Sequence, residues 1–194
     1  GILRGTMKAA NDEAYKKLIQ AFVDFYREDL NNDHWGEQVR FNPDNTISFT
    51  LLFQDLSETM AKYTLAPLRK FVSDHKELYS LEDKVTIIPA NKMWNYDYLI
   101  KNLPELITPN KEKGAPPQQF WWTPNTAEAG KYWYAYQSWW IPITLFSSEN
   151  SAKLSDAIYQ ASRLTGTTFH FNKGMSGAPA DVQAEVQKTA TNPH

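Results

Sequence analysis

The pattern of hydrophobic and polar positions changes period several times along the first quarter of the chain. Residues 2–10 alternate enough to predict a strand. After Asn11, which suits a helix cap, apolar side chains recur every three or four residues as far as Leu30 and predict an amphipathic helix. Residues 34–41 and 46–53 alternate again across a turn rich in Asn, Pro and Asp, which predicts an antiparallel hairpin.

Further along the chain the expected elements are shorter. Ser57 is placed to cap a second helix, which Pro67 bends or ends. After a charged link we expect a short strand over 85–88 and a short helix over 91–99. Residues 102–119 contain four prolines and a glycine, and we interpret them as a long loop inside one domain rather than as a domain boundary.

The C-terminal part of the chain again contains longer predicted elements. The pattern predicts, in order, a strand over 131–146 broken at Pro142, a helix beginning at 147–149, a strand over 167–172 and a helix over 178–189. Helices alternating with strands and hairpins favour an α+β fold of two layers, an antiparallel sheet with helices packed on one face. We expect residues 1–194 to form a single domain whose bare sheet face needs a partner.

Composition narrows the choice of partner. The net charge is −2, with 20 basic and 22 acidic residues and no basic stripe, so we expect no nucleic-acid partner. No apolar run approaches the ~20 residues that span a bilayer, so we expect a soluble chain and favour the cytoplasm. Both ends read as cuts from a longer protein, and the chain has no Cys for a metal site or a flavin link.

The usual catalytic motifs do not occur. The four histidines are scattered rather than set at ligand spacings, so we expect no metal. The eight glycines form neither a P-loop nor a dinucleotide motif, and the Gly-x-Ser-x-Gly elbow of serine hydrolases is missing. The chain therefore has no visible cofactor cradle of its own.

Two strands place polar groups where chemistry is conceivable. Glu37 alternates with Trp35, Val39 and Phe41, either as a buried carboxyl suited to a general base or as a solvated rim residue. His170 and Asn172 alternate with two phenylalanines, and their face meets either solvent or a site. A third predicted strand lies between these two in the sequence, and its residues 132–140 place aromatic rings on both faces. This arrangement suits a pocket for a planar ligand or contact with another protein.

Six segments, spread in order over nearly the whole chain, carry a family resemblance: GTMKAA at 5–10, HWGEQ at 34–38, PDNT at 43–46, PANKMW at 89–94, YQSWWIP at 136–142 and HFNKGMSGAP at 170–179. Together they resemble the substrate domain of bacterial berberine-bridge-like oxidases, within the vanillyl-alcohol-oxidase type of FAD enzymes. The resemblance implies a sheet that covers a flavin held by an FAD-binding domain of the same parent chain. It also implies oxidation of a hydroxyl-bearing small molecule, a sugar or an aromatic alcohol, and an inactive isolated chain.

The same resemblance suggests site residues. Glu37 or Tyr136 would accept a proton, and the substrate would contact Gln38, Gln137, Trp139, His170, Asn172 and Lys173. FAD would belong to the parent enzyme and would not be bound by this chain alone. Two other functions remain open: a free-standing module that binds carbohydrate or protein through its aromatic face, and a hydrolase that pairs Glu37 with a second acid.

Overall fold

The computed structural model describes residues 1–128, 130, 141–164 and 167–171. It divides the chain into two compact units. The first consists of Gly1–Ile87 and Trp140–His194, and the second of Ile88–Trp139.

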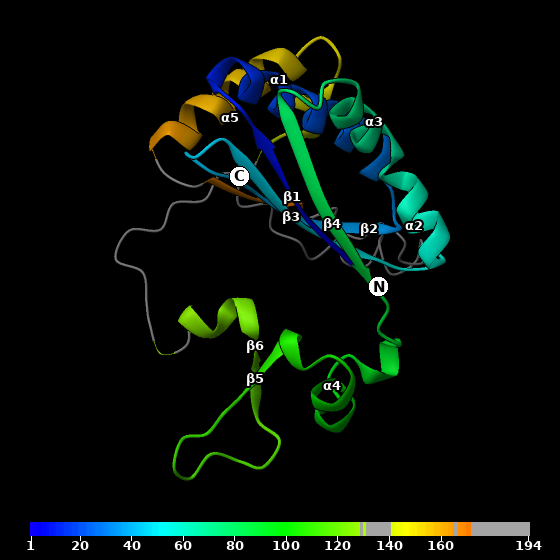
Figure 1. Cartoon of the computed structure of the whole chain (residues 1–194), viewed down its shortest axis with the longest axis vertical. Helices are drawn as coiled ribbons and strands as arrows, with labels where there is room; N and C mark the ends of the chain where they lie inside the picture. The colour runs from blue at the N-terminus through cyan, green and yellow to red at the C-terminus, as the bar shows by residue number, and fades with distance from the viewer. Residues whose placement is uncertain (129, 131–140, 165–166, 172–194) are drawn as a thin grey trace, which may run out of the picture. The chain divides into compact units, whose positions relative to one another are not determined.

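A five-stranded sheet forms the first unit, and every neighbouring pair of strands is antiparallel (Figure 1). Its strands are β1 (Ile2–Ala9), β2 (Trp35–Phe41), β3 (Thr46–Phe53), β4 (Tyr79–Thr86) and β7 (Thr167–Phe171), in the order β4-β1-β3-β2-β7. The predicted hairpin between β2 and β3 is confirmed, with Phe41 opposite Ile47 beside the turn.

Helices cover one face of this sheet (Figure 1). They are α1 (Asp12–Phe25), continued by the π-helical turn η1 (Tyr26–Leu30), then α2 (Glu58–Thr64), α3 (Ala66–Asp74) and α5 (Ser151–Leu164). The predicted caps are present, since Asn11 accepts a hydrogen bond from the Ala14 N–H and Ser57 accepts one from the Met60 N–H. Pro67 lies in the first turn of α3, directly after the break that ends α2. The expected two-layer α+β arrangement is thus confirmed.

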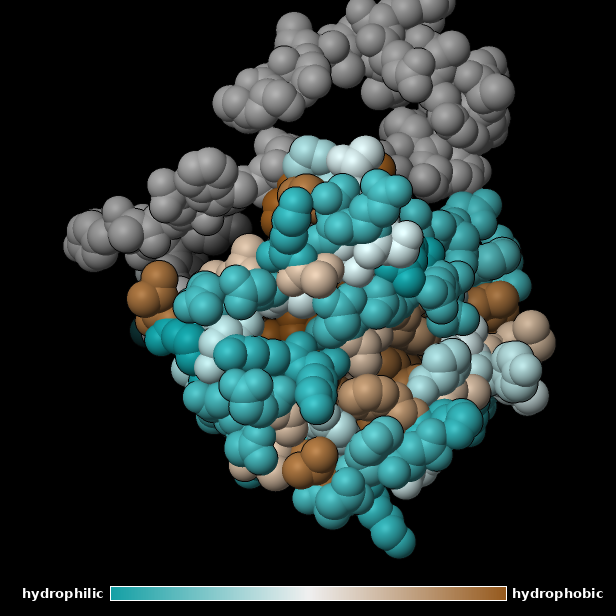
Figure 2. Space-filling view, turned by 90° about the horizontal axis from the view of Figure 1, so that it is seen from above, coloured by the Kyte–Doolittle hydropathy of each residue, from teal (hydrophilic) through white to brown (hydrophobic). Residues whose placement is uncertain are grey.

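The hydrophobic core lies between the two layers. Phe22 of α1 is buried against the sheet, with its ring centroid 6.0 Å from that of Phe41 and 6.3 Å from that of Phe49. Leu3 and Met7 of β1 are fully buried beneath the same helices. Side chains alternate along a strand, so the even-numbered residues of β1, β2, β3 and β4 project from the opposite face of the sheet, which we call the open face. Viewed from the helix side, the outer surface of the first unit is largely hydrophilic (Figure 2).

The second unit is built from short elements. Its helices are α4 (Tyr96–Asn102) and the 3₁₀ turns η2 (Ala90–Lys92), η3 (Pro104–Leu106) and η4 (Thr123–Glu128); strands β5 (Ile107–Pro109) and β6 (Phe120–Trp122) pair antiparallel. Leu99, Leu106 and Ile107 are buried in it. The region over 102–119 that we interpreted as a long loop therefore contains strand β5, which pairs with the aromatic strand β6.

Three predicted elements differ from the structure. The strand placed at 85–88 begins six residues earlier, at Tyr79, and ends at Thr86, because Tyr79, Leu81 and Val85 face the helices while Ser80, Glu82 and Lys84 face outward. The helix expected over 91–99 begins at Tyr96, where Asn95 caps it. Beyond Pro142, a 3₁₀ helix η5 (Ile143–Phe146) replaces the expected strand.

The remaining expectations for secondary structure lie outside the described residues. These are the strand over 131–140 and the last helix over 178–189. Among the helices that the structure describes, none combines the length and the apolarity needed to cross a bilayer.

Candidate functional site

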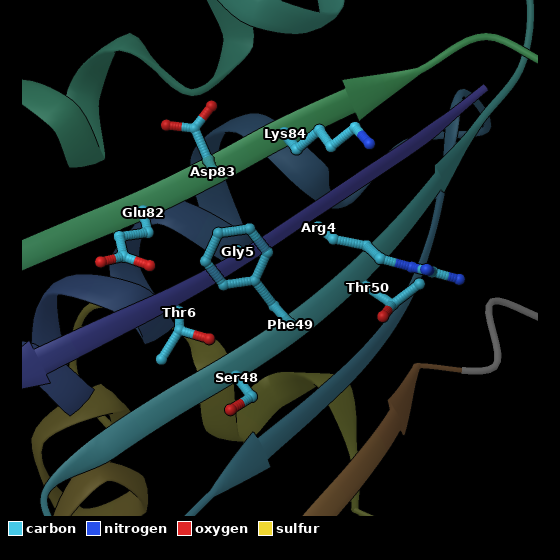
Figure 3. A pocket seen from close by; sticks show the side chains of 9 residues that line it. All are labelled: Arg4, Gly5, Thr6, Ser48, Phe49, Thr50, Glu82, Asp83 and Lys84. Carbon is cyan, nitrogen blue, oxygen red and sulfur yellow. The ribbon is translucent and has the colours of Figure 1, made fainter. Parts of the chain in front are cut away.

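The open face of the sheet is hollowed over β1, β3 and β4 (Figure 3). The hollow has a volume of about 460 Å³ and opens broadly to solvent. Six of its lining residues occupy open-face positions, and all six are polar: Arg4, Thr6, Ser48, Thr50, Glu82 and Lys84. The other three, Gly5, Phe49 and Asp83, alternate toward the helices. The hollow is therefore a polar surface supported by a hydrophobic core.

Gly5 allows the sheet to pack closely beneath this hollow. A Cβ atom at Gly5 would overlap the ring of Phe49 and would lie 2.8 Å from the backbone oxygen of Glu82. Because glycine has no Cβ, the Phe49 ring packs directly against the backbone of β1. This contact adds side-chain packing to the backbone pairing of β1 with β3 and β4.

The strand register arranges the polar side chains in two rows. The first row crosses four strands in the order Lys84, Arg4, Thr50 and Gln38. The second row follows the order Glu82, Thr6, Ser48 and Arg40. Residues directly opposite on neighbouring antiparallel strands have Cβ atoms about 4.5–5.5 Å apart, so each row presents a continuous line of hydrogen-bonding groups.

Positive charge gathers on this face although the whole chain carries −2. In β1 to β4 the open-face positions hold four cations, Arg4, Lys8, Arg40 and Lys84, and one acid, Glu82. Within the described part of the chain, neither Arg4 nor Arg40 forms an ion pair. A guanidinium group carries five N–H donors, so each of these side chains could donate hydrogen bonds to a ligand on this face.

The predicted site residues fall on different sides of the sheet. Gln38 is exposed in the first polar row, and the strand register places His170 of β7 opposite it. Glu37 is only 4% exposed and faces the helix layer. Tyr136, Gln137, Trp139, Asn172 and Lys173 lie outside the described residues.

Glu37 lies in an apolar part of the core. Its neighbours along the strand, Trp35 and Val39, are buried with it, so the interpretation of Glu37 as a solvated rim residue is wrong. Burial, together with the nearby charge of Glu37, raises the pKa of Tyr26 at the start of the π-helical turn. A ligand on the open face cannot touch this carboxyl, because the sheet backbone lies between them.

Sequence reasoning missed Arg4, Thr50 and Lys84. Arg4 and Thr50 occupy alternating positions of two correctly predicted strands, but the part of β4 before Val85, which contains Lys84, was interpreted as a charged link. The missing signal was the alternation of Ser80, Glu82, Lys84 and Thr86 with Tyr79, Leu81 and Val85, which is typical of a strand with one polar face and which only Asp83 interrupts.

The second unit carries a separate aromatic cluster. Trp94 is 72% exposed, its ring stacks at 6.4 Å from that of Phe120, and its edge meets Trp122 at 5.5 Å. The ring centroid of Tyr96 lies 6.2 Å from that of Phe120. An exposed ring held by other rings is a surface on which a sugar or another planar group can stack.

Metal-binding groups and similarity to known proteins were the two remaining sources of information about the site. In the ranges that the structure describes, no three His, Cys, Asp or Glu side chains lie close enough together to hold a metal ion. No protein family, curated protein or solved structure was found to match this chain. The functional proposal therefore depends on the geometry and on the sequence resemblance.

Proposed function

We propose that this chain is the substrate-binding part of an FAD-dependent oxidoreductase that oxidises a hydroxyl-bearing small molecule. The observation that carries the proposal is the sheet with helices on one face and a polar hollow on the other. A substrate domain of the berberine-bridge-like type requires this arrangement, because its sheet covers the flavin ring while its helices lie behind. The hollow would hold the substrate against the flavin.

The residues present fit a cover for FAD better than a complete FAD site. The open face supplies side-chain donors, such as Arg4 and Gln38, that suit polar substrate or flavin-ring atoms. The sequence has no glycine-rich turn to cradle the FAD phosphates, so another part of the parent protein would bind them. When bound, the flavin would supply the chemistry of accepting a hydride from the substrate carbon.

In this proposal the chain's own residues bind and orient the substrate. Thr50 and Gln38, in the first polar row, would hydrogen-bond substrate hydroxyl groups, and the sheet would exclude water from the reacting carbon. Tyr136 keeps the proposed role of proton acceptor, with Gln137, Trp139, His170, Asn172 and Lys173 as further substrate contacts. Glu37 has no step here, because its carboxyl lies behind the sheet.

The test uses the protein expressed from its full natural gene. The purified protein should show the visible absorbance of oxidised flavin, and that absorbance should bleach under anaerobic conditions with at least one sugar or aromatic alcohol. Gln38→Ala and Thr50→Val should slow bleaching about tenfold, as expected for lost hydrogen bonds to a reacting substrate. Lys153→Gln, on the exposed side of α5, is the control. A colourless protein that takes up no FAD would refute the proposal.

The aromatic cluster supports a second candidate, a carbohydrate-binding module without enzymatic activity. Trp94 would stack on a sugar ring while Phe120 and Trp122 hold it in place. Calorimetric titration with simple sugars would then show binding that Trp94→Ala abolishes. Tyr63→Ala, which removes another exposed ring, from α2, should leave that binding unchanged. Heats equal to dilution for every sugar would exclude this candidate.

A further inference from the structure

Two polar residues lie next to the aromatic cluster of the second unit. Asp97 follows Tyr96 in the first turn of α4, and Gln118 comes two residues before Phe120. Their side chains meet, since Nε2 of Gln118 lies 3.2 Å from Oδ1 and 3.1 Å from Oδ2 of Asp97. Both residues are exposed. The cluster of rings is therefore continued by a carboxylate and an amide that hydrogen-bond each other.

The backbone of Gln118 is strained where it makes this contact. Its φ angle of 64° lies in the left-handed region, which is unfavourable for a residue with a Cβ atom. Strain of this kind is found mainly at binding and catalytic sites, where the surrounding contacts maintain it. The strained residue here is the one whose amide is held beside the rings by Asp97.

We propose that the rings and the Asp97–Gln118 pair form one binding site for a neutral sugar chain of two or more pyranose units. The inference rests on the second candidate function, the carbohydrate-binding module, for which it names the ligand class. A sugar ring has C–H groups on its faces and hydroxyl groups at its edge. The faces stack on exposed aromatic rings, and the hydroxyl groups need hydrogen-bonding partners. This part of the second unit supplies both.

Trp94 is the stacking platform of the proposed site. Its ring is inclined by 28° to that of Phe120 and by 70° to that of Trp122, so it is supported from two directions. Because 72% of Trp94 is nevertheless exposed, a large part of the ring is accessible to a ligand. A ring that is already held in place loses little conformational freedom when a sugar binds to it.

The Asp97–Gln118 pair supplies acceptors for sugar hydroxyl groups. An ionised carboxylate has about four lone-pair sites, and the single Gln118 nitrogen leaves part of them for a ligand. Two hydroxyl groups on neighbouring ring carbons can donate hydrogen bonds to the pair together. An apolar protein surface would instead desolvate the carboxylate without replacing its hydrogen bonds, which is unfavourable. The negative charge also repels acidic sugars, so the pair favours a neutral one.

The spacing of these residues sets the length of the ligand. Gln118, Phe120 and Trp122 occupy alternate positions, and an extended chain advances about 3.3 Å per residue, so the line from the first to the last spans about 13 Å. Trp94 contacts the Trp122 end of this line, and Asp97 contacts the Gln118 end. A single sugar ring on Trp94 covers only part of the line, and a second ring extends it to the Asp97–Gln118 pair.

The experiment titrates glucose, cellobiose and the acidic disaccharide digalacturonate into the protein expressed from its full natural gene, with binding measured by calorimetry. We expect cellobiose to bind about tenfold more tightly than glucose, because its second ring adds hydrogen bonds to the pair. Digalacturonate should bind more weakly than cellobiose because of charge repulsion. Equal affinities for glucose and cellobiose, or tighter binding of digalacturonate than of cellobiose, would overturn the inference.

Variants assign the preference for cellobiose to the pair. Asp97→Ala and Gln118→Gly should each lower the affinity for cellobiose about tenfold, with little change for glucose. Glycine suits the left-handed backbone at position 118, so the melting temperature of Gln118→Gly should stay close to that of the wild type. This variant provides the comparison if Asp97→Ala does not fold. Glu149→Gln, which removes an exposed acid from the first unit, should bind both sugars as the wild type does.

The outcomes separate the inference from the candidate function on which it rests. If Trp94→Ala abolishes sugar binding but Asp97→Ala and Gln118→Gly bind glucose and cellobiose like the wild type, the carbohydrate-binding module stands and the extended site is wrong. Equal losses for the two sugars in Asp97→Ala would also contradict the extended site, because the pair would then contact the first ring. If no sugar gives a heat above that of dilution, both proposals fail.

Discussion

Glu37 and Gln38 are consecutive residues of β2, yet they lie on opposite faces of the sheet. Glu37 is buried among core side chains, whereas Gln38 is exposed in a row with Thr50, Arg4 and Lys84. A peptide group separates the two residues along the chain, but the sheet backbone separates their side chains in space. A carboxyl at position 37 and an amide at position 38 therefore cannot serve one ligand together.

Gly5 and Gly36 offer a matched test of how the sheet beneath the hollow is packed. Gly5→Ala places a Cβ against the Phe49 ring and the backbone of β4, so we expect it to destabilise the fold by about 1–3 kcal/mol. Gly36→Ala meets no atom within 4 Å and should change stability by less than about 0.5 kcal/mol. Urea unfolding of both variants measures the difference, and equal values would contradict this account of Gly5.

Arg163 joins α5 to α1 and to the turn before β3. Its guanidinium lies over the rings of Tyr15 and Tyr159, at 5.1 Å and 4.8 Å, and Nη1 lies 3.5 Å from the carboxylate of Asp12. Arg163→Ala should lower the free energy of unfolding by about 1–2 kcal/mol, because cation–π and hydrogen-bonding contacts are lost together.

Arg163→Lys separates charge from shape. It keeps the positive charge but loses the planar group that covers both rings, so its stability should lie between those of the wild type and Arg163→Ala. If the lysine variant matched the wild type, the contribution of Arg163 would come from charge alone. Thermal unfolding at low and high salt distinguishes these cases, since salt weakens the interaction with Asp12 more than the ring contacts.

Tyr15 makes the stability of the fold depend on pH in the alkaline range. Burial raises the pKa of its hydroxyl group from 10.0 to about 12, and the group donates a hydrogen bond to the Thr46 carbonyl. Because the folded state holds this proton more tightly, the stabilisation is complete below the unfolded pKa and is lost as pH rises from about 10 through 12. Tyr15→Phe, which has no such proton, should lose stability less steeply over that range in urea titrations.

Two ion pairs on α3 should contribute differently to the free energy of unfolding. Arg69 meets Asp83 of β4 through two donors, and the Asp83 side chain is only 17% exposed, so Arg69→Ala should cost about 1 kcal/mol by loosening α3 from the edge strand. Lys70, 74% exposed, pairs with Asp74 within the same helix, and Lys70→Ala should cost less than about 0.5 kcal/mol. Chemical denaturation of the two variants provides the comparison, and a larger loss in the lysine variant would contradict it.

Local signals in the sequence were sufficient where one period ran without interruption. The helix after Asn11, the hairpin around 42–45 and the division of a helix near Pro67 were all predicted, because capping, turn chemistry and proline geometry act over a few residues. The strand from Tyr79 was predicted too short, since its charged side chains look like a solvated link until the neighbouring strand β1 gives them a shared face.

By itself, the sequence determined the two-layer α+β class, the alternation of side chains along β2 and the lack of a glycine-rich phosphate-binding motif. Only the tertiary structure decided that Arg4, Thr50 and Lys84 share one hollow, because they lie on strands that are distant in sequence and meet through antiparallel register. It also decided that Glu37 faces the core. Alternation tells which residues share a face, but the packing of α1 tells which face is covered.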